Sequence, residues 1–212
     1  MGGTFDPIHL GHLAVAEQAR ETLDLEAVLF MVAADPPHKQ GQRISPAADR
    51  VAMVELAVAG NPGFRVSRFE LDRPGPSWSV DTVTVLAARA DVEGREPPVL
   101  IISAEALAGF PTWREPERIL DRCRVAVVPR NTTTPDPGWI AATFPGREDR
   151  FVLLDGPRLG HAATDIRARV AAGRSIRYLV PRAVEAYIRD HQLYRPDEEP
   201  APMPEPATRS RP

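Results

Sequence analysis

The sequence predicts a three-layer α/β/α fold built around a mostly parallel β-sheet. Four short runs, residues 28–32, 99–102, 125–128 and 151–154, are entirely apolar, which is typical of strands buried on both faces. Segments with helical periodicity lie between these runs. Strands that alternate with helices of about 10–15 residues indicate parallel β-α-β crossovers, with helices on both faces of the sheet.

Helical periodicity is clearest in three segments of the first half of the chain. Apolar residues recur at three- and four-residue spacing in residues 13–23, 51–58 and 80–90, so each segment has one apolar face to bury. A further strand is predicted at residues 64–71, where apolar residues alternate with polar ones. This alternation shifts by one position after Val66, which predicts a β-bulge.

Two more helices are predicted near the C-terminus. Residues 163–165 offer N-cap chemistry for a helix over residues 166–172, and Gly173 suits the position just after that helix. Pro181 opens a second helix, which extends to about Asp190.

Length and composition restrict the class of protein. A chain of 212 residues is long enough to bury one sizeable core, and we expect one folded domain over residues 1–194. Residues 195–212 form a proline-rich tail with too few apolar side chains to pack, and we expect it to be disordered. Cys123 is the only cysteine, so an intrachain disulfide is excluded. We expect it to be a small buried apolar residue in a reducing compartment.

Charge and hydropathy argue against nucleic-acid and membrane partners. A formal net charge of −3 does not suit a protein that wraps duplex DNA. The longest apolar run, residues 27–34, is far shorter than the roughly 20 residues of a membrane helix, and no secretion leader opens the chain. We therefore expect a cytoplasmic protein.

Histidines and glycines gather at the start of the chain. His9, His12 and His38 lie close in sequence to Lys39 and to the Gly2-Gly3 pair. Glycines let the backbone approach a ligand closely, and a helix that begins near His12 would direct free N–H groups at it. Imidazole and ammonium groups add charge-assisted hydrogen bonds. The combination predicts a site for a polyphosphate.

Two other interpretations of the His-x-x-His spacing remain open. A zinc site would need a third ligand and an outer hydrogen-bond partner, and the sequence marks neither. Ordinary capping or core histidines are the second alternative. The preceding residues 2–7, Gly-Gly-Thr-Phe-Asp-Pro, favour the phosphate site over both.

Five segments resemble one enzyme family. Residues 2–13, Gly-Gly-Thr-Phe-Asp-Pro-Ile-His-Leu-Gly-His-Leu, resemble the signature of the nucleotidyltransferase superfamily with the His-x-Gly-His motif, and within it the nicotinate-nucleotide adenylyltransferases of bacterial NAD synthesis. Pro-Pro-His-Lys at 36–39, Pro-Ser-Trp-Ser-Val-Asp-Thr at 76–82, Trp113, and Ile-Arg-Tyr-Leu-Val-Pro at 176–181 match that family in the same order. The resemblance covers the whole predicted domain and implies a Rossmann-like fold.

The resemblance implies transfer of AMP from ATP to nicotinate mononucleotide, which forms nicotinate adenine dinucleotide and pyrophosphate. The phosphate of the mononucleotide is already anionic at neutral pH, so the reaction needs neither a general base nor a covalent nucleophile. The enzyme has to hold two anions in line and stabilise charge on the departing pyrophosphate. Mg²⁺ is expected to arrive on ATP, with no metal-ligating residue in the protein.

The same resemblance assigns roles to individual residues. The expected catalytic residues are His9, His12 and Lys39. ATP is expected to contact the glycine-rich turn, the two histidines, a carboxylate near its ribose and the start of a later helix: Gly3, Thr4, Phe5, His9, His12, Glu105, Thr164 and Arg167. The mononucleotide site is expected to have Trp113 stacked on the pyridine ring. The residues expected in this site are His38, Lys39, Asp81, Thr82, Trp113 and Arg114.

The chain departs from the family pattern at three places. The family carries a short apolar strand before the Gly-Gly-Thr turn, whereas nothing precedes Met1 here. We expect Met1 to be an internal methionine of a longer natural protein, and it stays open whether the first strand is missing from this chain. Glu105 replaces an aspartate, and Ala162 and Ala163 replace two serines. Each lost hydrogen bond to a charged group costs about 1.5–3 kcal/mol, which affects the rate more than the type of reaction.

Several alternatives remain open at this stage. Pantetheine-phosphate adenylyltransferases share the His-x-Gly-His motif, but the segments at residues 36–39 and 176–181 speak against that family. A nucleotide-binding module without catalysis is the alternative from another class. For single residues, Trp113 could be a partly buried surface aromatic, and Asp81 and Thr82 could cap a helix. The sequence does not decide between nicotinate and nicotinamide mononucleotide, and a homo-oligomer is compatible with it.

Overall fold

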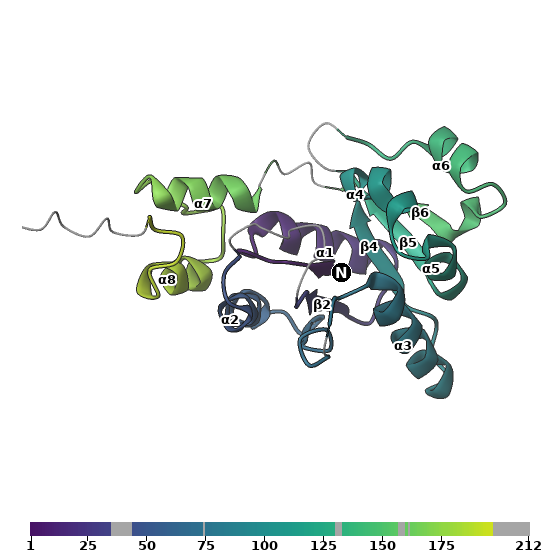
Figure 1. Cartoon of the computed structure of the whole chain (residues 1–212), viewed down its shortest axis with the longest axis horizontal. Helices are drawn as coiled ribbons and strands as arrows, with labels where there is room; N and C mark the ends of the chain where they lie inside the picture. The colour runs from purple at the N-terminus through teal and green to yellow at the C-terminus, as the bar shows by residue number, and fades with distance from the viewer. Residues whose placement is uncertain (35–43, 74, 130–132, 157–159, 161, 197–212) are drawn as a thin grey trace, which may run out of the picture.

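Two parallel three-stranded sheets form the centre of the computed structural model (Figure 1). The structure describes all residues except 35–43, 74, 130–132, 157–159, 161 and 197–212. The first sheet has the order β1-β2-β3, and its strands are Gly2–Gly3, Val28–Val32 and Phe64–Ser67. The second has the order β4-β5-β6, and its strands are Val99–Ser103, Arg124–Val128 and Phe151–Leu153.

Every strand pair within the described residues is parallel, as the apolar runs predict. Residues of β1 and β4 line one cavity, so the two sheets adjoin at these strands. In doubly wound parallel α/β folds, ligands bind at the carboxyl ends of the strands. The first strand is represented only by the two residues of β1, which pair with Met31 and Val32 of β2.

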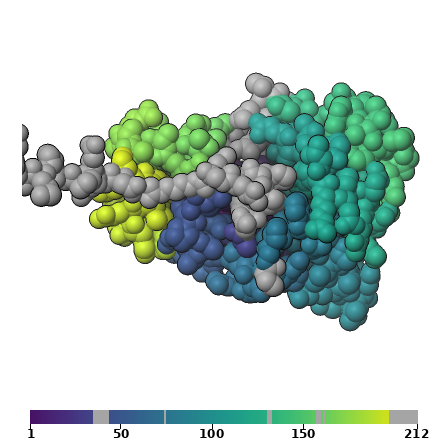
Figure 2. Space-filling view, viewed as in Figure 1, coloured from purple at the N-terminus to yellow at the C-terminus, as the bar shows by residue number. Residues whose placement is uncertain are grey.

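Helices connect the strands and close the fold. In chain order they are α1 (Leu10–Thr22), α2 (Ala47–Val58), α3 (Ser79–Val92), α4 (Ala104–Gly109), α5 (Pro116–Arg122), α6 (Pro137–Thr143), α7 (Ala163–Ala171) and α8 (Arg182–Asp190). The last two lie at the opposite end of the molecule from α5 and α6 (Figures 1 and 2). There α8 packs on α2, where the hydroxyl of Tyr187 donates to Oδ1 of Asp49 over 2.8 Å.

The core consists of two apolar clusters, and β5 contributes to both. Ala126 and Val128 belong to the cluster that also contains buried residues of β2, α2 and α8. Val125 and Val127 belong to the cluster formed with residues of α3, α4 and α5. Since alternate side chains of a strand point to opposite faces, this sheet is covered on both sides, which explains its unbroken apolar sequence.

Two local predictions are wrong. The strand predicted at 64–71 ends at Ser67 without a bulge, because the Ser67 hydroxyl accepts from the N–H of Phe69 and the N–H of Leu71 donates to the carbonyl of Arg68 over 2.8 Å. The chain turns there, although Leu71 still packs against the core. Helix α7 begins at Ala163 rather than 166, so the predicted N-cap residues lie inside its first turn.

The other fold predictions concern Gly173, Cys123 and the C-terminal tail. Gly173 follows α7 with a φ of +64°, as its predicted position requires. Cys123 is 1% exposed, and burial raises the pKa of its thiol to about 11. Residues 197–212 lie outside the described part of the chain, so the division into a domain and a tail stays a prediction. None of the helices formed by the described residues is long and apolar enough to cross a membrane.

Candidate active site

The turn after β1 is held by the ring of Phe5. This residue is 3% exposed and has a φ of +51°, in the left-handed region. Its ring meets that of His12 edge to face at 5.1 Å and lies 5.8 Å from that of Phe30. A Cβ on Gly3 would stand 3.0 Å from the ring of Phe5, so the close approach of backbone and ring here favours glycine.

His9 and His12 form a stacked pair at the start of α1, with ring centroids 3.7 Å apart. His9 is 3% exposed, and its backbone N–H donates to Nδ1 of His12 over 3.3 Å. A nitrogen that accepts a hydrogen bond carries no proton, so the neutral ring of His12 holds its proton on Nε2. This hydrogen bond therefore makes Nε2 of His12 a donor, which suits a phosphate oxygen.

The backbone of α1 is less available to an anion than the sequence suggests. The N–H of Leu10 donates to the carbonyl of Leu179 over 3.0 Å, and the N–H of His12 donates to the carbonyl of His9 over 2.9 Å. Two of the N–H groups in the first turn of α1 thus already have backbone partners, and their contact with an anion stays a prediction. The imidazole of His12 is a further candidate donor at this end of the helix.

Helix α7 brings two predicted ATP contacts to the turn. Nη1 of Arg167 donates to the carbonyl of Asp6 over 2.8 Å, and Nη2 lies 3.5 Å from Oγ1 of Thr164. Residues 161 positions apart in sequence thus meet at the end of β1. The guanidinium uses one nitrogen for the turn and has further N–H groups for a phosphate.

A cavity of about 190 Å³ lies between the ends of β1 and β4. Gly3 and Thr4 line it from the turn, while Trp113 and Arg114 line it from the segment before α5. The structure therefore brings together residues that the sequence assigned separately to ATP and to the mononucleotide. Trp113 is partly buried, and its ring packs 5.2 Å from that of Phe110.

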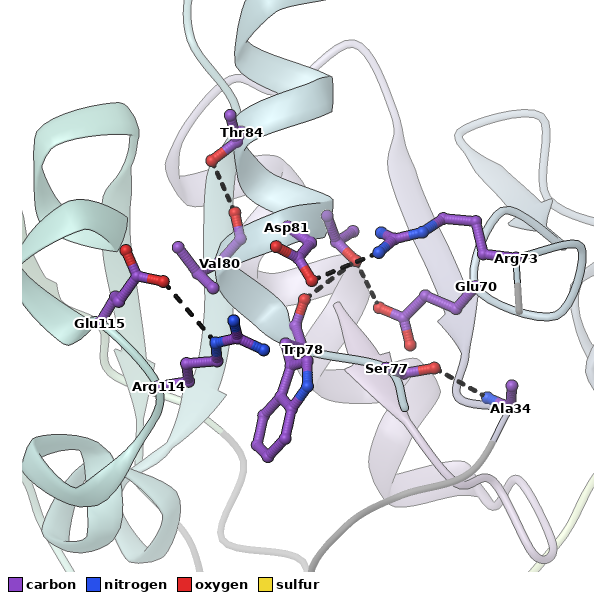
Figure 3. A network of polar contacts seen from close by, with 11 residues as sticks. Ala34, Glu70, Arg73, Ser77, Trp78, Val80, Asp81, Thr84, Arg114 and Glu115 are labelled. Carbon is purple, nitrogen blue, oxygen red and sulfur yellow. Dashed lines mark hydrogen bonds and ion pairs between the residues drawn. The ribbon is translucent and has the colours of Figure 1, made fainter. Parts of the chain in front are cut away.

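The start of α3 reaches this cavity through a polar network (Figure 3). The hydroxyl of Thr82 donates to Oε1 of Glu70 over 2.7 Å, and Nη2 of Arg73 lies 3.3 Å from Oδ2 of Asp81. Thr82 is 7% exposed, whereas Glu70 lines the cavity. The side chain of Thr82 therefore acts on the cavity through Glu70 rather than directly. Glu70 was not predicted from the sequence, because it lies in the segment wrongly predicted to be a strand.

Trp78 and Arg114 close the network on the opposite side from Arg73 (Figure 3). The guanidinium carbon of Arg114 lies 5.5 Å from the centre of the Trp78 ring, and Nε is 3.6 Å from Oε1 of Glu115. The hydroxyl of Ser77 accepts from the N–H of Ala34 over 3.3 Å, which joins this wall to the end of β2. Among the described residues that line the cavity, Arg114 is the one with a cationic side chain.

The other predicted site residues are Glu105, His38 and Lys39. Glu105 is exposed in the first turn of α4, just after the carboxyl end of β4. His38 and Lys39 lie outside the described residues. No group of three histidine, cysteine, aspartate or glutamate side chains suited to a metal ion gathers in the described part of the chain.

Comparison with known proteins decides the family. The cytidylyltransferase-like family matches residues 1–169. A probable nicotinate-nucleotide adenylyltransferase of Roseiflexus sp. (strain RS-1) is 48% identical over 92% of this chain and 96% of its own length. One of Thermus thermophilus is 46% identical over 92% of this chain and 97% of its own. The chain belongs to the nicotinate-nucleotide adenylyltransferases of the cytidylyltransferase-like family. The family inferred from the sequence motifs is confirmed.

Solved structures confirm the fold expected of such an adenylyltransferase. The nicotinic acid mononucleotide adenylyltransferase of Plasmodium falciparum, complexed with NaAD, superposes with a TM-score of 0.73 over 91% of this chain and 94% of that one, at 14% identity. A protein of Vibrio parahaemolyticus described as a putative nicotinate-nucleotide adenylyltransferase superposes with a TM-score of 0.63 at 16% identity, over 92% of each chain. At these identities the likeness concerns the Rossmann-like fold.

Proposed function

We propose that this adenylyltransferase transfers AMP from ATP to nicotinate mononucleotide and releases pyrophosphate, as a cytoplasmic step of NAD synthesis. The observation that carries the proposal is the 48% identity to a probable nicotinate-nucleotide adenylyltransferase over nearly the whole of both chains. The cavity that joins the glycine-rich turn to Trp113 and Arg114 supports it, because a dinucleotide product needs adjoining sites for its two halves.

In the proposed reaction, an oxygen of the mononucleotide phosphate attacks the α-phosphorus of ATP. A new phosphorus–oxygen bond forms, the bond to the β-phosphate oxygen breaks, and pyrophosphate leaves with the electron pair. The protein contributes position and charge rather than a covalent intermediate. ATP enters as its Mg²⁺ complex, so the metal belongs to the substrate.

On the ATP side, the backbone of Gly3, Thr4 and Phe5 would lie along the adenylate. Nε2 of His12 would donate to a phosphate oxygen, and the stacked ring of His9 would hold His12 in this orientation. Arg167, which already touches the turn, would bind a further phosphate with its remaining N–H groups.

On the mononucleotide side, Trp113 would stack on the pyridine ring, since its partly exposed indole lines the cavity. The backbone N–H of Arg114 and the first turn of α3, which contains Asp81, would together receive the nicotinate carboxylate and the rest of the mononucleotide. Lys39 and His38 would add positive charge between the two phosphates. Glu105 would accept from a ribose hydroxyl of ATP.

The test is pyrophosphate release from ATP and Mg²⁺ with nicotinate mononucleotide, nicotinamide mononucleotide or phosphopantetheine in parallel assays. We expect release with nicotinate mononucleotide and none with phosphopantetheine. Release with phosphopantetheine alone would assign the chain to the other adenylyltransferases. A wild-type protein that binds ATP but releases no pyrophosphate with any acceptor would make it a nucleotide-binding module. The variant His12→Ala serves as the control for contaminating activity.

A further inference from the structure

The turn before α1 buries a carboxylate. Asp6 is 3% exposed, and each of its carboxylate oxygens accepts a hydrogen bond. Oδ1 accepts from the hydroxyl of Tyr194 over 2.6 Å, and Oδ2 accepts from the backbone N–H of Ser45 over 3.1 Å. Both donors are neutral groups, so the hydrogen bonds satisfy the carboxylate without giving it a counter-charge.

An arginine meets the same aspartate through its backbone. Nη1 of Arg167 donates to the carbonyl of Asp6 over 2.8 Å, and the proposed function assigns the remaining N–H groups to a phosphate of ATP. A carboxylate is a strong competitor for a guanidinium, because the two groups form short, charge-assisted and often bidentate hydrogen bonds. Arg167 nevertheless contacts the neutral carbonyl of Asp6 and not its charged side chain.

The hydroxyl of Tyr194 explains this choice of partner. It occupies Oδ1 of Asp6, and it lies 3.9 Å from Sδ of Met53, so its surroundings are partly apolar. Burial and the charge of Asp6 raise the pKa of Tyr194 far above its ordinary value, whereas the charge of Arg167 lowers it. The hydroxyl therefore keeps its proton for Asp6, and it is close enough to Arg167 to feel the charge of the guanidinium.

Other contacts hold the turn in place without Tyr194. Arg50 of α2 is 2% exposed, and its Nη1 donates to the carbonyl of Thr4 over 3.0 Å. The buried ring of Phe5 packs against the rings of His12 and Phe30. Loss of the Tyr194 hydroxyl should therefore leave the turn folded and release one carboxylate oxygen of Asp6 beside Arg167.

We propose that Tyr194 is a positioning residue for adenylyl transfer, whose hydroxyl occupies the carboxylate of Asp6 so that Arg167 keeps its remaining N–H groups for ATP. This proposal rests on the proposed function, because that function assigns Arg167 to a phosphate. Tyr194 itself touches no reacting atom. Its effect should therefore depend on the guanidinium of Arg167 and on the negative charge of Asp6.

Tyr194→Phe in the full chain is the first test, since it removes only the hydroxyl. We expect kcat/KM for ATP to fall about tenfold, while the KM for nicotinate mononucleotide stays within about twofold of the wild type. Tyr187→Phe is the matched control, because it removes a hydroxyl that donates to Asp49 and joins α8 to α2 away from the turn. This control should change kcat/KM for ATP by less than about twofold. All assays run at a temperature at which circular dichroism shows each variant to be folded.

Two double-mutant cycles separate this role from a purely structural one. In an Arg167→Gln background, Tyr194→Phe should lower kcat/KM for ATP by less than about twofold, because no guanidinium is left to be captured. In an Asp6→Asn background its cost should be equally small, since asparagine carries no charge. The double variant Asp6→Asn with Tyr194→Phe should therefore use ATP better than Tyr194→Phe alone. A hydroxyl that only stabilises the fold would give the opposite order, because the double variant loses a further favourable contact.

The outcomes that overturn the proposal are distinct from failure of the proposed function. The proposal is wrong if Tyr194→Phe lowers kcat/KM for ATP by the same factor with and without Arg167, or if Tyr187→Phe is equally harmful. It is also wrong if adding Asp6→Asn to Tyr194→Phe lowers the activity further. If Tyr194→Phe alone is unfolded, a large difference between Asp6→Asn and the double variant overturns the proposal. A wild-type chain without turnover would instead refute the proposed function.

Discussion

At the scale of single residues, the orientation of His12 is the feature closest to the proposed chemistry. Its Nδ1 is occupied by the N–H of His9, which leaves Nε2 as the donor. We expect His12→Ala to lower kcat by about 10²–10³, the usual loss for one donor that stabilises transition-state charge. His12 is only partly buried, so the melting temperature should change little. Steady-state kinetics and thermal unfolding on the same preparation test both, and a wild-type kcat would remove this residue from the mechanism.

The hydrogen bond between Thr82 and Glu70 gives a second prediction at this scale. Thr82→Val keeps the shape of the side chain but leaves Oε1 of Glu70 without its donor. We expect the KM for nicotinate mononucleotide to rise about three- to tenfold, because one hydrogen bond to a charged group is lost and Glu70 lines the cavity. The KM for ATP should stay nearly constant. Equal changes in both KM values would mean that this hydrogen bond affects ATP binding as much as mononucleotide binding. That result would contradict a role specific to the mononucleotide.

At the scale of elements, the sequence predicts what is local and apolar. The strands β2, β4, β5 and β6 were predicted because unbroken apolar runs are rare outside buried strands. The end of β3 was missed because Leu71 packs on the core from a turn, so its apolar character resembles that of a strand residue. Alternation alone cannot distinguish these two cases.

The end of α7 provides a prediction about an element. Gly173 has a φ of +64°, and a Cβ there would meet no atom within 4 Å, so a side chain would be strained by the backbone alone. We expect Gly173→Ala to lower the free energy of unfolding by about 1 kcal/mol. Gly60→Ala is the matched control, since Gly60 also has open space but no positive φ. Urea unfolding of both variants measures the difference, and equal effects would contradict the role of the glycine conformation.

At the scale of the whole molecule, the site depends on contacts between distant parts of the chain. Arg50 reaches Thr4 across 46 positions, and Tyr194 reaches Asp6 across 188. No local pattern encodes such pairs, so the sequence motifs identified the family and suggested residues for a phosphate site, but they did not reveal these long-range contacts. An indirect signal was present for Arg50, which lies three and four residues before Met53 and Val54 and so falls on the buried face of α2.

The contact between Tyr194 and Asp6 makes stability depend on pH in a defined direction. Burial, reinforced by the charge of Asp6, raises the pKa of Tyr194 far above its ordinary value of 10.0. Below about pH 10 the hydroxyl keeps its proton in both the folded and the unfolded state, so its stabilising contribution is complete. Above that pH the unfolded state releases the proton while the folded state retains it. The free energy of unfolding should then fall, by at most about 1.4 kcal/mol per pH unit from this group.

Tyr194→Phe isolates this contribution, because phenylalanine keeps the ring and removes only the titrating hydroxyl. Below pH 10 the variant should be less stable than the wild type, since Oδ1 of Asp6 loses its donor inside the fold. The stability difference between the two proteins should stay constant from pH 7 to about pH 9 and shrink between about pH 10 and 11. Guanidinium unfolding at each pH measures it. A constant difference up to pH 11 would show that Tyr194 titrates alike in both states, and that the end of the folded chain is not held to the active-site turn by this buried hydroxyl.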